Sequence, residues 1–168
     1  MIRGEKTKIS GASLIEATVA AFVSALFLGS LFTLNVTGMK TIRTAREATS
    51  ASQVLQQRIE SLRIANWQQA TNADWLKNNL LNADAAGANS LKLLTETLTL
   101  VPYGSATVGN IEVVRAGGTT QIVSRNSSLL SESAVKVIWK VDYSGGINST
   151  ATTRQAVAIL AKGGVAKW

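Results

Sequence analysis

The chain contains neither cysteine nor histidine among its 168 residues. Without cysteine it can form no disulfide, no thiolate metal site and no cysteine nucleophile. Without histidine it also lacks the commonest protein ligand for metals and the usual general base near neutral pH. Composition therefore excludes most catalytic constellations, and we expect no enzymatic activity, no cofactor and no bound metal.

Acidic residues are few: the chain has 10 of them and 17 lysine and arginine residues, which gives a formal net charge of +7. Such a surplus can indicate binding to nucleic acid or to an anionic membrane. The basic residues are scattered along the chain rather than clustered. We therefore expect a moderately basic, solvated surface and no dedicated face for nucleic acid.

What the chain does have is a long apolar run, from Ala17 to Met39, without a single ionisable residue. As a helix this run would be about 34 Å long, slightly more than the roughly 30 Å of a bilayer's hydrocarbon core. Glu16 stands directly before it. A carboxylate at that depth costs about 2.5 kcal/mol or more, so its presence calls for a function.

Two ordinary explanations leave Glu16 unaccounted for. A secretory signal peptide also has a basic start and an apolar run, but this run is long for one and no small-residue cleavage site follows it. A simple signal anchor explains the length and not the acid. Basic residues flank the run on both sides, so the positive-inside rule does not decide its orientation.

The segment before the run carries a family resemblance. A short basic leader ends in a glycine, and a glutamate is the fifth residue after that glycine, at the start of the apolar helix. This arrangement resembles the cleavage and methylation motif of the type IV pilin-like, or prepilin, family. Its residues here are Gly11, Ala12, Ser13, Leu14, Ile15 and Glu16.

The resemblance implies a processing and assembly pathway. A prepilin peptidase would cut between Gly11 and Ala12 on the cytoplasmic side and methylate the new amine of Ala12. Glu16 would then be the assembly carboxylate that meets the Ala12 amine of a neighbouring subunit, because an unpaired buried charge costs several kcal/mol. A local alternative is that Glu16 pairs with its own chain's amine or stabilises its own helix N-terminus.

Partners and location follow from the same resemblance. It implies other pilin-like subunits, the peptidase and an inner-membrane assembly platform as partners. It places the chain in the bacterial inner (cytoplasmic) membrane as a single span, with the head outside the cytoplasm, before incorporation into a type IV pilus or a type II secretion pseudopilus. Ala12 replaces the phenylalanine common at that position, and the apolar helix lacks the proline of many major pilins. The chain therefore resembles minor pilins and minor pseudopilins most.

The domain organisation expected on this basis has four parts. Residues 1–11 are the leader, 12–39 the membrane or filament-core half of a helix, 40–66 its amphipathic half and 67–168 a globular head. In the amphipathic half, apolar residues recur at steps of three and four, which predicts one face packed on the head, with the charged residues elsewhere. The predicted apolar face consists of Ile42, Ala45, Ala48, Ala51, Leu55, Ile59 and Leu62.

In the head, residues 74–82 predict a short helix and residues 82–90 a loop. Asn82, Asp84 and Asn89 offer oxygen ligands there, but a single carboxylate is too little charge for calcium, and an ordinary turn is favoured. Strands are expected at 91–101, and at 111–115 and 119–124 as a hairpin around two glycines.

The last two strands are the clearest. Residues 135–143 alternate apolar and polar side chains at period two, and a strand over 152–161 follows after a glycine turn. Trp139 is expected in the core. The fold class is therefore predicted as α+β, with one long N-terminal helix packed on an antiparallel sheet of four or five strands. This closing hairpin resembles that of minor pilin heads.

A second function from another class is a DNA-binding pilin of a DNA-uptake system. It would need Lys136, Lys140 and Arg154 on one face of the closing hairpin, where they could contact phosphates. Trp139 is predicted on the opposite face from the two lysines, so no aromatic residue supports the basic set. Nucleic acid is accordingly an unlikely partner.

Overall fold

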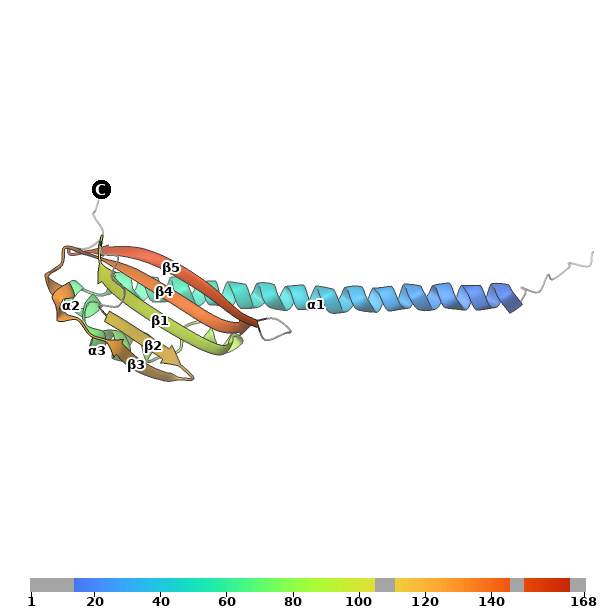
Figure 1. The fold of residues 1–168 in the computed structure, drawn as a ribbon, viewed down its shortest axis with the longest axis horizontal. Helices are drawn as coiled ribbons and strands as arrows, with labels where there is room; N and C mark the ends of the chain where they lie inside the picture. The colour runs from blue at the N-terminus through green and yellow to red at the C-terminus, as the bar shows by residue number, and fades with distance from the viewer. Residues whose placement is uncertain (1–13, 105–110, 146–149, 164–168) are drawn as a thin grey trace, which may run out of the picture. The chain divides into compact units, whose positions relative to one another are not determined.

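The computed structural model describes residues 14–104, 111–145 and 150–163. In these ranges the chain is an α+β protein with a long N-terminal helix, α1 (Leu14–Ile64), and a five-stranded antiparallel sheet (Figure 1). The chain divides into two compact units, Met1–Thr41 and Ile42–Trp168. The predicted fold class is confirmed at this level, and α1 ends close to the predicted end at Asn66.

The sheet belongs to the second unit and has the order β3-β2-β1-β4-β5 (Figure 1). β1 therefore lies at the centre, and β3 and β5 are the edges. The hairpin around Gly117 and Gly118 is confirmed, with both glycines at positive φ, 57° and 79°. The strands are β1 (Lys92–Pro102), β2 (Ile111–Ala116), β3 (Thr119–Ser124), β4 (Ala134–Gly145) and β5 (Thr150–Ala161).

The inner face of β4 forms much of the hydrophobic core. Its apolar residues recur at every second position, as the sequence predicts, and those on this face are all buried, whereas Ile138 on the opposite face is only partly buried. Trp139 is completely buried, so its predicted place in the core is confirmed. The inward residues are Val135, Val137, Trp139, Val141 and Tyr143.

Short helical segments connect α1 to the sheet. α2 (Trp67–Ala70) is followed by α3 (Ala73–Trp75), whose N-terminus is capped by the Asn72 side chain, which accepts bonds from two backbone N–H groups. The chain continues as a π-helix, η1 (Leu76–Leu81), with buried leucines at both ends. The helix predicted over 74–82 is thus present, but most of it has the wider π geometry.

The part of α1 from Ile42 onward packs on the sheet through a face that agrees with the predicted one only in part: Ala51, Leu55 and Leu62 are buried as predicted. Its buried residues recur at steps of three and four but include two charged side chains, and Ile42 is 55% exposed. The predicted face was wrong at the two charged positions, because Arg58 pairs with Glu96 and Glu47 pairs with Arg43, and such pairing offsets the desolvation of the charges. The buried set is Glu47, Ala51, Val54, Leu55, Arg58 and Leu62.

Candidate functional site

Glu16 lies in the first turn of α1 and is exposed. A negative side chain in this position interacts favourably with the partial positive charge of the helix N-terminus. Gly11 and Ala12, the residues of the predicted cleavage and methylation site, lie outside the described residues. The structure therefore places the predicted assembly carboxylate at the start of the helix and leaves its pairing with an amine untested.

The helix that follows Glu16 exposes its apolar side chains on all sides. Every large apolar side chain from Leu14 to Met39 is between 40% and 86% exposed. Among the described residues, α1 is the one helix that is long and apolar enough to cross a membrane. Such a surface is stable only in an apolar environment, either a bilayer or a bundle of similar helices.

Hydroxyl groups in this segment are satisfied by the helix itself. Thr18 donates to the carbonyl of Leu14 at 2.8 Å, and Ser24 donates to that of Ala20 at 2.8 Å. Thr33, Thr37 and Thr41 make the same bond one turn back. Because each hydroxyl already has an acceptor, its transfer into hydrocarbon leaves no unmatched donor.

The second unit contains a buried network of charged residues that sequence reasoning missed. Arg58 on α1 binds Glu96 on β1 through two parallel bonds, Nε to Oε2 at 2.8 Å and Nη2 to Oε1 at 2.9 Å. Arg115 on β2 donates from Nη1 to Oε1 of the same carboxylate at 3.2 Å. Glu96 is completely buried, and both arginines are less than 8% exposed.

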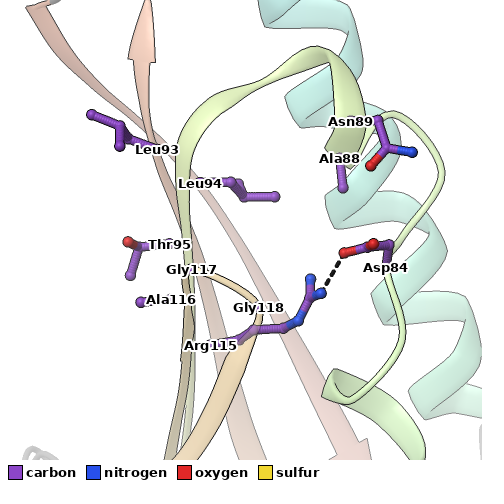
Figure 2. Close-up of a pocket in the computed structure, with 10 residues that line it drawn as sticks. All are labelled: Asp84, Ala88, Asn89, Leu93, Leu94, Thr95, Arg115, Ala116, Gly117 and Gly118. Carbon is purple, nitrogen blue, oxygen red and sulfur yellow. Dashed lines mark hydrogen bonds and ion pairs between the residues drawn. The ribbon is translucent and has the colours of Figure 1, made fainter.

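The network also holds the loop after η1. Arg58 donates to the backbone carbonyls of Leu80 and Ala83, the latter at 2.8 Å. Figure 2 shows the Arg115 guanidinium directed toward Asp84, to which its Nη2 donates. This hydrogen bond and the charge of Arg115 hold the pKa of the Asp84 carboxyl below its usual value. One charged cluster therefore connects α1, two strands and the loop.

A pocket of about 590 Å³ adjoins Asp84 and Arg115. Its walls come from the loop of residues 84–89, from β1 and from the β2–β3 turn (Figure 2). Asp84 offers an oxygen ligand for a metal, but its carboxylate forms an ion pair with the Arg115 guanidinium. The positive charge of Arg115 beside it disfavours a bound cation. No group of three metal-binding side chains occurs within the described part of the chain.

The alternation of β1 and β2 contains a signal that could have revealed the network. Glu96 has the same parity as the buried Leu98 and Leu100, and Arg115 the same parity as Val113. A charge at an inward position of a strand predicts a buried partner of opposite sign. The sequence did not indicate Arg58 as this partner, because the charged residues of the helix were expected outside its apolar face.

The basic set of the closing hairpin is not assembled as the DNA-binding alternative requires. Arg154 pairs across the ladder with Val141, whose side chain faces inward, whereas Lys140 pairs with Gln155 on the outer face. Arg154 and the two lysines are thus on opposite faces, and the shared face that this alternative requires is not formed. Lys140 in addition binds Asp142 at 2.8 Å.

Comparison with known proteins gives no relative from which a role could be transferred. No family model, no curated protein and no solved structure matches the chain. A function must therefore rest on the apolar helix, its acidic first turn and the buried charged network of the head.

Proposed function

We propose that the chain is a structural subunit of the type IV pilin-like family, a minor pilin or minor pseudopilin. It is cut between Gly11 and Ala12 by a prepilin peptidase and methylated at Ala12. It spans the bacterial inner membrane once, with its head outside the cytoplasm. It then enters a type IV pilus or a type II secretion pseudopilus through its N-terminal helix.

The observation that carries this proposal is the contrast between the two parts of α1. Up to Met39 the helix exposes all its large apolar side chains, whereas from Glu47 to Leu62 it buries one face in the head. Burying one large apolar side chain contributes about 1.5–3 kcal/mol, so the exposed part has a strong drive to leave water. A subunit that moves from bilayer to helical bundle satisfies this drive in both states.

Glu16 fits the same proposal through its position. It is the acidic residue of the first helical turn, at the boundary between the leader and the apolar run. Cleavage after Gly11 leaves a cationic amine at Ala12, four residues before Glu16 in the sequence. In a bundle of low dielectric, each amine then needs a counterion, and the carboxylate of an adjoining subunit supplies one.

Processing is the first experiment. In a host that supplies a prepilin peptidase, Gly11→Leu leaves a full-length, membrane-held precursor, whereas the unaltered chain gives the mass of residues 12–168 plus one methyl group. Intact-protein mass spectrometry of the membrane fraction separates the two. Gly4→Leu, at the other leader glycine, is the matched control and matures normally. Normal maturation of Gly11→Leu refutes the proposal.

A further inference from the structure

A basic groove lies on the second unit, between the start of its helical segment and the start of the sheet. It has a volume of about 690 Å³. α1 contributes Ile42, Arg43 and Arg46 to its lining, and the chain entering β1 contributes Ser90 and Lys92. It shares no lining residue with the pocket beside Asp84.

The charges in this groove are unbalanced. Arg43 donates to Glu47 at 2.9 Å, so these two charges compensate each other. Arg46 and Lys92 are exposed, and neither makes an ion pair within the described ranges. Two cations therefore face an open groove without a counterion among the described residues. A bound anion would supply the missing charge.

The sequence position of the groove indicates which anion is present there. The apolar run ends at Met39, and Arg43 and Arg46 follow it by four and seven residues. Along a helix these separations correspond to about 6 and 10 Å. The headgroup layer of a bilayer extends roughly 5–8 Å beyond the hydrocarbon on each side. A bilayer that holds the run thus has its phosphates at the level of these arginines.

We propose that this groove binds the phosphate of an anionic lipid headgroup in the leaflet on the head's side of the membrane. Arg46 and Lys92 bind the phosphate, and the exposed Ile42 contacts the glycerol and upper acyl region. This inference rests on the membrane insertion included in the proposed function. It adds a specific lipid class as a partner of the subunit before assembly.

The test uses the full chain in lipid nanodiscs made of phosphatidylcholine with a minor fraction of phosphatidylglycerol. Native mass spectrometry of the chain released from the discs counts the lipids that remain bound. The unaltered chain retains phosphatidylglycerol in preference to phosphatidylcholine, and the preference weakens with added salt. The double variant Arg46→Gln/Lys92→Gln loses about tenfold or more of this preference, since each surface cation near an anionic bilayer contributes about fivefold.

The control variant is Arg154→Gln/Lys162→Gln, which removes the same charge from strand β5 and the residue after it. It keeps the preference of the unaltered chain. An equal loss of preference in both double variants would show that net charge alone acts, and full preference in Arg46→Gln/Lys92→Gln would show that these cations do not act; either result overturns the groove. A chain that enters the discs without any lipid preference overturns this inference and leaves the proposed function standing. A chain that does not enter them at all overturns both.

Discussion

Glu96 is completely buried and accepts bonds from two arginines, so its charge is compensated only inside the folded head. Glu96→Gln leaves Arg58 buried without its carboxylate partner, while Arg115 keeps only its ion pair with Asp84. We expect it to lower the free energy of unfolding by about 3–5 kcal/mol. Urea unfolding of the full chain in detergent, followed by tryptophan fluorescence, measures this loss.

Glu60→Gln is the matched control for this substitution. Glu60 accepts a bond from Arg63 at 2.9 Å, but both side chains are at least half exposed. Exposed pairs of this kind contribute about 0–1 kcal/mol. An equal loss in the two variants would contradict the structural role of the buried network.

Asp84 makes the stability of the head depend on pH. Its folded pKa is below the ordinary value of 3.8 because Arg115 donates to its carboxylate. The unfolded chain therefore binds a proton more readily than the folded one. The stabilisation is fully present above about pH 4 and is lost as the pH falls through the lowered folded pKa.

We expect the urea midpoint of the full chain to fall between pH 4 and pH 2. Asp74 adds to the effect, since its pKa is lowered by the hydrogen bond from Arg125. Asp84→Asn reduces the dependence, because the amide does not titrate. Urea titrations of both chains across this range measure it, and an undiminished slope in the variant would exclude Asp84 as a source.

Leu93 stores backbone strain at an exposed position. Its φ is +49°, its side chain is 84% exposed, and it lies where the β1–β4 register shifts. The left-handed conformation costs a residue with a Cβ roughly 1–2 kcal/mol. Glycine avoids this cost, but the greater conformational entropy of its unfolded chain lowers the free energy of unfolding by about 0.5–1 kcal/mol. Leu93→Gly should therefore raise the free energy of unfolding by up to about 1 kcal/mol.

Leu93→Ala is the control, because alanine removes the exposed side chain and keeps the Cβ. It should give no gain in the same urea titration. If alanine stabilises the head as much as glycine does, the gain comes from removing apolar surface, and the backbone strain has no part in it.

At the scale of elements, α1 is fixed to the head by a single face. Leu62 is 2% exposed, whereas Ile64, two residues later, is 86% exposed. Leu62→Ala leaves a cavity in the core and should cost about 2–5 kcal/mol. Ile64→Ala removes a similar side chain from water and should change the unfolding free energy by less than about 0.5 kcal/mol. Comparable losses in the two variants would contradict the orientation of α1 in the structure, in which Leu62 faces the core and Ile64 faces solvent.

The elements differ in how much of them could be predicted from the sequence. β4 and the β2–β3 hairpin were predictable, because side-chain alternation and a pair of glycines are local signals. The buried face of α1 was predictable only in part. Arg58 is expected to face solvent unless its hydrogen bonds to Glu96 and to the carbonyl of Leu80 are known. Glu47 was also placed outside the apolar face, although its partner Arg43 is only four residues away on the same helix. Long-range pairing of buried charges leaves little trace in local periodicity.

At the scale of the whole molecule, the first unit and the head have opposite requirements. The second unit, which includes the end of α1 and the head, has its own hydrophobic core and compensates its inner charges by itself. The apolar run has no such complement among the described residues, and α1 enters it with an acid in the first turn. Under the proposed function, the missing complement is first the bilayer and then the helices of neighbouring subunits.

Under the proposed function, Glu16 is needed for the step from the bilayer to the helical bundle. We expect Glu16→Ala to be processed and membrane-inserted but to enter filaments at least a hundredfold less, because an unpaired amine in the bundle costs about 3 kcal/mol or more. Immunoblots of the sheared filament fraction, normalised to the membrane fraction, measure the ratio. Glu5→Ala changes an acid of the leader that is removed, so it should assemble normally. Filament entry of Glu16→Ala at the native level would show that no carboxylate is needed to neutralise the amine.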